Sequence, residues 1–303
     1  MEKEDIIGKI EDLKKEKDAI ILAHNYQRSE IQDIADFVGD SLELSRKAQS
    51  VSCRTVVFCG VRFMAETAKI LSPEKMVLLP RKEAGCPMAD MITQDTLKKL
   101  KEKHPGAQVL SYVNTNAEVK AESDVCCTSS NAVEVARNMT TQKIIFVPDR
   151  NLASFVSKFM KKKIIPYKGY CYVHERIRAE NIIKAKKLHP DAKVVVHPEC
   201  LPEVIELADR VASTGGMVKF ARESTAKKFI IGTEEGLIHR LKKENPGKEF
   251  FAAGSALMCL DMKLITLEDV YLSLREEKYQ IVLEDSIRKK AKKALDRMLE
   301  YTG

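Results

Sequence analysis

Three of the eight cysteines in this chain stand at matched positions. Cys86, Cys171 and Cys259 each follow an apolar run and a short loop, with separations of 85 and 88 residues. If the chain is built from related units, equivalent positions meet near a common axis, so we expect the three thiols to lie close together. Because thiolates bind zinc and iron–sulfur clusters, the spacing predicts a metal site.

The number of matched cysteines bears on the kind of metal. A structural zinc usually takes four ligands, commonly with a local C-x₂₋₄-C pair, and no such pair accompanies these three. An iron–sulfur cubane is usually held by four thiolates, so three would leave one iron open to water or substrate, where it would act as a Lewis acid. On spacing alone a cluster, a zinc ion and coincidence all remain open.

The other five cysteines have simpler interpretations. Cys53, Cys59, Cys126 and Cys127 lie in or beside apolar runs and are expected to be small buried residues. Cys200 closes the segment 197–200 and could line the site. Because residues 1–17 are rich in charges and lack an apolar signal core, we expect a cytoplasmic protein, in which cysteines serve as ligands or core residues rather than disulfides.

A weak internal repeat supports the matching of the cysteines. The sequences HPGA and HPDA begin 18 residues beyond Cys86 and Cys171, and apolar runs end in Tyr112 and His197, each 26 residues beyond. Such short apolar runs, each preceded by a charged helical pattern, indicate strands that are buried on both faces. Alternating strands and helices build parallel sheets with helices on both faces.

The repeat predicts an α/β protein of three similar α/β/α domains with parallel sheets, arranged around a pseudo-threefold axis with a central active site. The expected units are 1–82, 83–167 and 168–258, and the segment 259–303 carries the third cysteine and packs back on the core. The first unit is expected to hold an additional helical insert at 31–50, opened by Ser29 and Gln32 at capping-box spacing. We match the later strands 77–80, 144–148 and 229–232 with one another.

Polar residues close several of the predicted strands. In open α/β sheets the ligand site lies at the carboxyl ends of the strands, so these residues are site candidates. Taken alone, Ser41 after Asp40 would be part of a helix cap, and the segment 213–216 would be a turn or an anion site at a helix start. Their occurrence at equivalent strand ends predicts one shared cavity. The candidate segments are 24–26, 112–114, 128–130, 197–199 and 213–216.

Composition excludes some classes of function. The net charge of +7 favours anionic ligands but also fits a merely soluble surface, and the densest basic runs lie on helix-like stretches. No apolar run is long enough to cross a membrane. We therefore expect neither nucleic acid nor a membrane as a partner.

Eight short segments together resemble the quinolinate synthase family, the iron–sulfur A-protein family, over nearly the full length. They are HNYQ at 24–27, GDS at 39–41, GCPMA at 85–89, YVNT at 112–115, TSSN at 128–131, GYCYVH at 169–174, HPEC at 197–200 and STG at 213–215. Some relatives carry further cysteines near the last ligand. Here position 262 is Met262, so Cys259 is the sole candidate in that region.

The resemblance implies an enzyme with a [4Fe–4S] cluster, held by Cys86, Cys171 and Cys259 and with one open iron. The family reaction condenses iminoaspartate with dihydroxyacetone phosphate to form quinolinate for NAD biosynthesis, with release of phosphate and two waters. These two substrates are the implied partners, and the enzyme that produces iminoaspartate is a further candidate. The sequence leaves the oligomeric state open.

The resemblance also implies roles for individual residues. Because enolisation and dehydration require groups that move protons near neutral pH, we expect Glu199 and His197 to be catalytic, assisted by Tyr26, His24 and His174. The residues expected to contact substrate are His24, Ser41, Tyr112, Val113, Asn114, Ser129, His197, Pro198, Glu199, Ser213 and Thr214.

Two rival functions deserve a test. A diphthamide-type radical enzyme also gathers one cysteine from each of three α/β domains around a cluster, but the strand ends 24–26 and 197–199 argue against it. A non-catalytic protein that binds small anions would explain the serine and threonine residues but would leave the three matched cysteines without a role.

Overall fold

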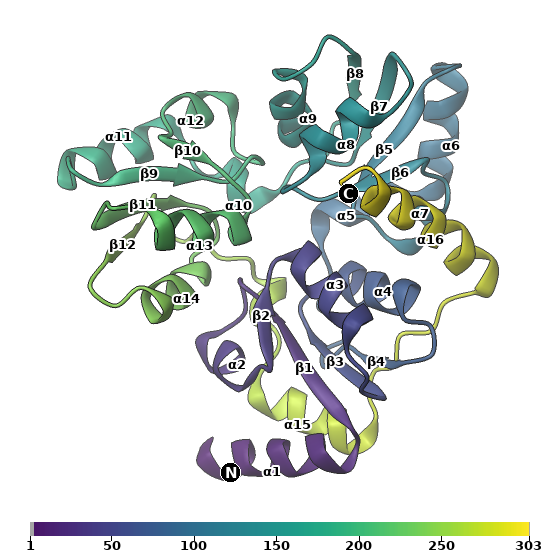
Figure 1. Cartoon of the computed structure of the whole chain (residues 1–303), viewed down its shortest axis with the longest axis vertical. Coiled ribbons are helices and arrows are strands. Elements are labelled where there is room, and N and C mark those ends of the chain that lie inside the picture. Colours follow the sequence, from purple (N-terminus) through teal and green to yellow (C-terminus); the bar gives the residue numbers. More distant parts are fainter. Residues whose placement is uncertain (1–2, 303) are drawn as a thin grey trace.

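The computed structural model describes residues 3–302, and its strands form three four-stranded parallel sheets (Figure 1). The strand orders are β2-β1-β3-β4, β6-β5-β7-β8 and β10-β9-β11-β12, so each sheet has its first and third strands at the centre. Helices flank the sheets, which confirms the prediction of three similar α/β/α domains.

The first domain is built on strands whose residues are almost all apolar. Central strand β3 is buried throughout, as expected for a parallel strand with helices on both faces. Helix α3 begins with a capping box in which Asp40 accepts the N–H of Glu43, and the side chain of Glu43 accepts the N–H of Asp40. The elements are α1 Lys3–Glu16, β1 Ala19–His24, α2 Ser29–Ile34, β2 Phe37–Gly39, α3 Ser41–Ser50, β3 Thr55–Cys59, α4 Arg62–Leu71 and β4 Met76–Leu78.

The second and third domains repeat this order. The second comprises α5 Pro87–Asp90, α6 Gln94–Lys103, β5 Gln108–Tyr112, α7 Ala117–Ala121, β6 Val125–Cys127, α8 Ala132–Asn138, β7 Lys143–Val147, α9 Arg150–Ser157 and β8 Lys163–Pro166. The third comprises α10 Tyr172–Glu175, α11 Ala179–Leu188, β9 Lys193–Val196, α12 Pro202–Glu206, β10 Arg210–Val211, α13 Thr214–Glu223, β11 Lys228–Gly232, α14 Leu237–Glu244 and β12 Glu249–Ala252.

The segment 31–50 is not an additional insert, which corrects the sequence prediction. It supplies β2 to the first sheet, and the path β1-α2-β2-α3-β3 has counterparts in both other domains. Gly39 is the last residue of β2. The expected capping box is also wrong, because α2 is preceded by Arg28 without a side-chain cap, and Gln32 donates to backbone carbonyls.

In the first domain, the sequence prediction matched the wrong strand, 77–80, with the later strands of the other two domains. Strand β4 is the edge strand of its sheet, whereas β7 and β11 are third strands at the centre of theirs. Their true counterpart is β3. Sequence matching failed here because central and edge strands are both short apolar runs.

An aspartate repeated in all three domains fixes the start of each first strand. Asp36, Asp124 and Asp209 accept the backbone N–H groups of Ile21, Val109 and Val194 at 2.7, 2.7 and 2.8 Å. The separation along the chain is 15 residues each time. The three domains therefore share a hydrogen-bonding pattern as well as a topology.

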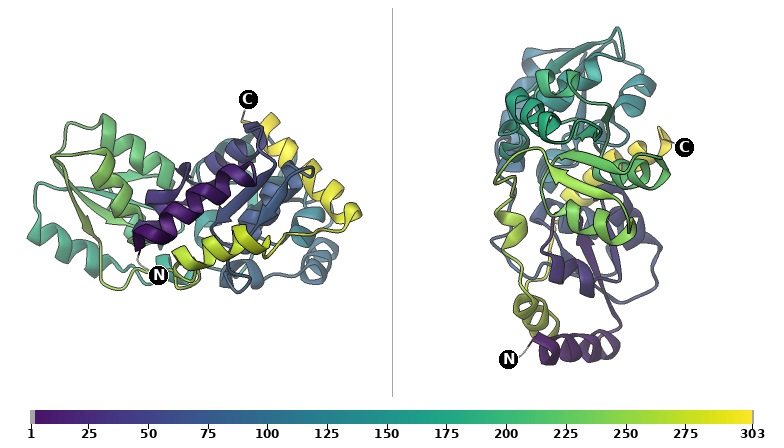
Figure 2. Two further views of the ribbon diagram at one scale, coloured as in Figure 1. Left: turned by 90° about the horizontal axis from the view of Figure 1, so that it is seen from below. Right: turned by 90° about the vertical axis from the view of Figure 1, so that its left-hand side faces the viewer.

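The C-terminal segment continues with the 3₁₀ turn η1 Asp261–Lys263, α15 Leu267–Glu276 and α16 Asp285–Glu300. Helix α15 packs beside α1, and α16 crosses to the second domain and packs on α7 and β6 (Figures 1 and 2). Buried residues of α16, among them Leu295 and Met298, join the core that the first two domains share. The segment thus connects two domains.

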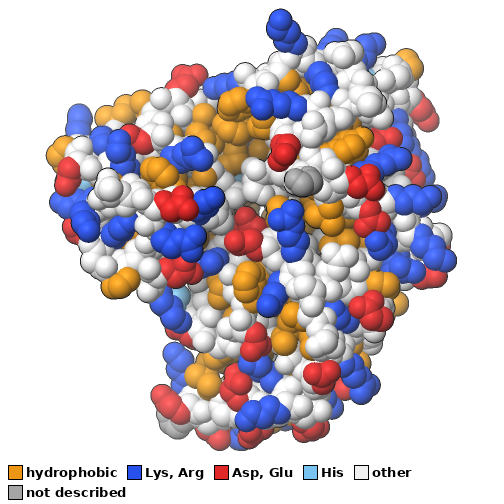
Figure 3. Space-filling view, in the orientation of Figure 1, with side chains coloured by type: hydrophobic (Ala, Val, Ile, Leu, Met, Phe, Trp, Pro, Cys, Tyr) orange, Lys and Arg blue, Asp and Glu red, His pale blue; other side chains and the backbone are white. Residues whose placement is uncertain are grey.

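Among residues 3–302, no helix combines the length and the apolar character that crossing a membrane requires. On the face drawn in Figure 3, Lys and Arg side chains are interspersed with Asp and Glu.

Candidate functional site

One cavity is lined by residues from all three domains, at the carboxyl ends of the sheets. This is the edge at which parallel α/β sheets present ligand-binding residues. Most of the site residues predicted from sequence line it: His24, Tyr26, Ser41, Cys86, Tyr112, Asn114, Ser129, Cys171, His174, His197, Glu199, Thr214 and Cys259. Residues that are far apart in the chain therefore share a single chamber.

Three predicted residues lie outside this lining. Ser213 caps α13 by accepting the N–H of Gly216, and its hydroxyl donates to Asp40. Pro198 lies with Ser213 in a neighbouring hollow, and the side chain of Val113 is buried in the core. Four described residues of the lining fall in none of the segments that the sequence singled out: Val61, Phe63, Met64 and Glu234. The lining also holds Asp40, Gly85, Met88, Thr128, Val173 and Met262, which the sequence analysis named or placed in such segments without giving them a role in the site.

The three matched cysteines occupy equivalent places in the fold. Cys86 follows β4, Cys171 follows β8 and Cys259 follows β12, so each comes after the last strand of its domain. Cys86 and Cys171 immediately precede the short helices α5 and α10. These three cysteines are partly exposed, whereas the other five are buried.

Electrostatics indicate what the three thiols require. Burial raises the pKa of each of the three thiols, and the charge of Glu199, followed by the nearby Cys259 and Cys86, raises that of Cys171 further. Three thiolates could therefore be held together here only with a compensating cationic group. A metal centre supplies that compensation, because ligand binding displaces the thiol protons.

The donor set fits a group with three thiolate ligands. In the described part of the chain no fourth cysteine lines the cavity: Cys200 is buried beneath it and its thiol lies 3.4 Å from the carbonyl oxygen of Gly232. Ligand atoms of Cys171, His174 and Glu199 also lie within 4.8 Å of one another. In that second set, however, His174 and Glu199 already contact other side chains.

Glu199 is the centre of a buried polar network. Its carboxylate accepts a hydrogen bond from the Tyr112 hydroxyl at 2.6 Å, and its other oxygen lies 2.9 Å from Nδ1 of His174. Burial alone would raise the pKa of Glu199, but the interactions with His197, His174 and Tyr112 lower it to about 2. The group is therefore an anion at neutral pH.

Two histidines of the cavity are held neutral. Burial is the largest cause that lowers the pKa of His24 and of His197 to about 3. The rings of His174 and His197 stack with their centroids 4.5 Å apart. A neutral imidazole can donate from one nitrogen and accept at the other, which suits proton transfer without a net change of charge.

Thr233 joins two of the predicted catalytic residues. Its hydroxyl lies 2.6 Å from the hydroxyl of Tyr26 and 2.8 Å from Nε2 of His174. Burial and the charge of Glu199 raise the pKa of Tyr26 well above its usual value, so the phenol keeps its proton. Hydrogen bonds thus run from Tyr26 through Thr233 to His174, whose Nδ1 lies 2.9 Å from the Glu199 carboxylate.

Comparisons with known proteins identify one family over nearly the whole chain. The family model described as quinolinate synthetase A protein matches residues 8–300. A quinolinate synthase of Thermodesulfovibrio yellowstonii is 58% identical, covering 95% of each chain. Quinolinate synthases of Alkaliphilus metalliredigens and Methanosarcina acetivorans are each 52% identical and cover 98% or more of both chains.

Proposed function

The chain belongs to the quinolinate synthase family, and we propose that it forms quinolinate for NAD biosynthesis by condensing iminoaspartate with dihydroxyacetone phosphate. The observation that carries the proposal is the family match over residues 8–300, with relatives of nearly equal length. Membership makes the chain an enzyme, which removes the non-catalytic anion-binding protein as a rival.

The cavity offers donors that suit two anionic substrates. Hydroxyls of Ser41, Ser129 and Thr214 line it, as does the amide of Asn114. Thr214 is the first residue of α13, whose N-terminus adds a favourable partial charge for a carboxylate or phosphate. Asn25 donates to the Thr214 hydroxyl at 2.9 Å and holds it in place across two domains. We assign substrate binding to these groups together with His24, Tyr112 and His197.

The Glu199 network is arranged to take and return protons. As an anion, Glu199 can accept a proton from a carbon or hydroxyl of the substrate, and the directed hydrogen bonds keep its oxygens in position. The path through His174 and Thr233 to Tyr26 could relay that proton across the cavity. His197, which burial keeps neutral, adds a further proton carrier beside Glu199.

Cys86, Cys171 and Cys259 would hold a [4Fe–4S] cluster, which when bound supplies a Lewis acid at its open iron for a departing oxygen. The aliphatic and aromatic residues of the cavity wall, Val61, Phe63, Met64 and Met88, limit the access of water to that end of the cavity. Water exclusion strengthens every charge interaction with the substrates.

The test is an anaerobic assay with iminoaspartate and dihydroxyacetone phosphate, in which quinolinate and released phosphate are measured. We expect equal amounts of both from the iron-loaded protein and neither from the iron-free protein. A loaded, folded protein that forms no quinolinate would contradict the proposed function. S-adenosylmethionine, which a radical enzyme of the rival class should need, is omitted from the assay.

An open iron leads to a prediction about inhibitors. A small dithiol that carries two carboxylates should inhibit competitively, because its sulfurs suit iron and its carboxylates suit the donors of the cavity. It should also change the electron paramagnetic resonance spectrum of the reduced cluster. If Cys200 is a fourth ligand instead, the dithiol leaves that spectrum unchanged and Cys200→Ala loses the cluster.

A further inference from the structure

We propose that Asp149 and Glu234 are positioning residues for the cluster, a role that rests on the proposed function and deepens it. Each is a wholly buried carboxylate that accepts the backbone N–H of a matched cysteine. They hold the loops that present Cys171 and Cys259, and by binding these two N–H groups they lower the reduction potential of the bound cluster.

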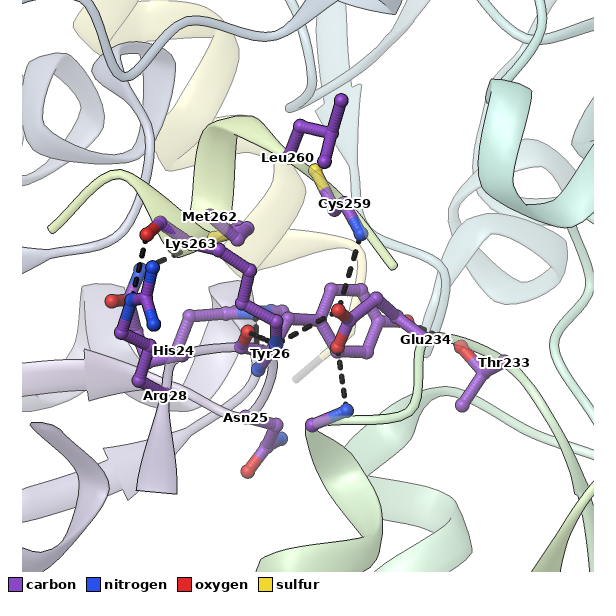
Figure 4. Close-up of polar contacts among 12 residues, drawn as sticks. His24, Asn25, Tyr26, Arg28, Thr233, Glu234, Cys259, Leu260, Met262 and Lys263 are labelled. Atoms are coloured by element: carbon purple, nitrogen blue, oxygen red, sulfur yellow. Dashed lines mark hydrogen bonds and ion pairs between the residues drawn. The ribbon is translucent and has the colours of Figure 1, made fainter. Parts of the chain in front are cut away.

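The contact of Glu234 is the more extensive of the two. One carboxylate oxygen accepts the N–H of Cys259 at 3.1 Å and lies 2.8 Å from Nζ of Lys263, and the other accepts the N–H of Gly236 at 2.7 Å. Figure 4 shows Glu234 between Cys259 on one side and Tyr26 and Lys263 on the other. One side chain therefore fixes the segment that follows β12.

The ion pair between Glu234 and Lys263 also connects this segment to the first domain. Lys263 also donates to the carbonyl oxygen of Tyr26, and Arg28 donates to the carbonyl oxygen of Lys263 at 2.7 Å. The packing is so close that a Cβ atom on Gly236 would lie 2.6 Å from the Lys263 ammonium and 2.8 Å from the Glu234 carboxylate. The position of Cys259 is thus coupled to that of the catalytic candidate Tyr26.

Asp149 makes the corresponding contact in the second domain. One of its oxygens accepts the N–H of Cys171 at 3.2 Å, while the other accepts the N–H of Leu152 at 2.6 Å and begins helix α9. The backbone around it also bridges to the cysteine loop, because Arg150 donates its N–H to the carbonyl oxygen of Gly169.

The two acids occupy equivalent positions, which makes a chance arrangement a poor explanation. Asp149 stands two residues beyond the end of β7, and Glu234 two residues beyond the end of β11, so each follows the third strand of its domain. The same position in the first domain is Val61, two residues beyond β3. An acid at this position therefore accepts the N–H of a matched cysteine in two of the three domains.

The chemistry of iron–sulfur clusters gives these contacts their expected effect. Hydrogen bonds to the sulfurs and the net charge near a cluster set its reduction potential. The carboxylates take the N–H groups of Cys171 and Cys259, which are then not free to donate to the sulfurs. An N–H group held in this way is a weaker donor to the cluster, so both contacts disfavour reduction.

The test compares Glu234→Gln and Asp149→Asn with the parent and with Glu66→Gln. Glu66 is a matched control because it is a buried carboxylate that accepts the N–H of Ala117 at 2.9 Å and the Nε–H of Arg62 at 3.0 Å rather than the N–H of a matched cysteine. The proteins are reconstituted with iron and sulfide under anaerobic conditions. Iron loss to a chelator is timed, and the reduction potential is measured by a titration followed by electron paramagnetic resonance.

We expect both variants to lose iron about tenfold faster than the parent, since partners outside the ligand set typically contribute 10–100-fold to metal affinity. Their potentials should shift in the positive direction, and Glu66→Gln should match the parent. Lys263→Gln removes a positive charge instead and should shift the potential in the negative direction. A purely structural role would not produce opposite shifts.

Outcomes that overturn the inference are distinct from those that overturn the proposed function. If both acid variants keep the parent's potential and rate of iron loss, the positioning role is wrong even where the parent forms quinolinate. If the potentials shift as expected but the parent forms no quinolinate, the inference stands and the proposed reaction fails. A folded parent that takes up no cluster overturns both. Should Glu234→Gln fail to fold, Asp149→Asn and Lys263→Gln still decide the sign of the shift in reduction potential.

Discussion

Alanine at Cys171 is expected to abolish cluster assembly and quinolinate formation while leaving the fold intact. Only two of the three matched thiols would remain, which is too few to retain a cubane. Cys171 packs at the edge of the core rather than at its centre, so the loss of one sulfur should not unfold the chain. Cys86→Ala and Cys259→Ala should behave alike. Iron and sulfide analysis, with absorbance at about 400 nm after anaerobic reconstitution, measures the result.

The remaining cysteines provide matched controls for that experiment. Cys53, Cys59, Cys126 and Cys127 are buried, so their replacement by alanine should change stability at most and leave iron uptake unchanged. Cys200→Ala separates a three-ligand site from a four-ligand site. Full iron retention by Cys171→Ala would contradict the ligand assignment.

The sequence alone predicted the architecture because the repeat is visible in two kinds of residue: the matched cysteines and the polar residues at strand ends. The spacing of Cys86, Cys171 and Cys259 reflects the fact that each follows the last strand of its domain. Polar residues at buried strand ends, such as His24 and Glu199, had to face a common cavity because parallel strands present their carboxyl ends at one edge. Residues at equivalent positions along the chain therefore lie close together in the fold.

The errors have a physical origin as well. Strand β4 was matched with β7 and β11 because hydrophobic pattern does not distinguish an edge strand from a central one. A better signal was present in the 15-residue separation between Ile21 and Asp36, which recurs in the other two domains. Aligning the units on that aspartate would have placed β3 correctly and shown that 31–50 is part of the repeat.

Contacts between domains could not be predicted residue by residue. Thr233 and Glu234 follow a strand, as Asp149 does. The side chains that they contact can be distant in sequence: the hydroxyl of Thr233 contacts that of Tyr26, which is 207 residues away. Sequence pattern carries no information on which side chains face each other across a domain boundary. The acid two residues beyond the third strand is nevertheless a readable signal in two domains, at Asp149 and Glu234.

The second large effect is expected at Glu199. Glu199→Gln should lower turnover by about 10²–10⁴-fold, the usual contribution of general acid–base catalysis, while iron content stays at the parent level. Glutamine nearly preserves the shape of the side chain but cannot accept a proton at neutral pH. Its amide would also point a donor at either Tyr112 or His174, both of which now face carboxylate oxygens. Steady-state rates at saturating substrates measure the loss.

Glu175→Gln is the matched control for Glu199→Gln. Glu175 lies nearby and accepts hydrogen bonds from Arg150 and Asn151, and Asn151 also donates to the backbone carbonyl of Glu199. It does not line the cavity, so its replacement should leave turnover within a small factor of the parent. A comparable loss in both variants would mean that disturbed packing, not a missing proton carrier, explains the effect.

The pH dependence tests whether Glu199 stays ionised in the working enzyme. Because the pKa of Glu199 is lowered to about 2, the folded enzyme keeps this carboxylate ionised as the pH falls from about 9 to about 5. The ratio of parent to variant rates should therefore stay constant over that range, since neither form of residue 199 changes its charge there. A ratio that collapses toward one near about pH 5 would show that the carboxylate titrates in the working enzyme, and an unchanged rate at every pH would show that Glu199 moves no proton.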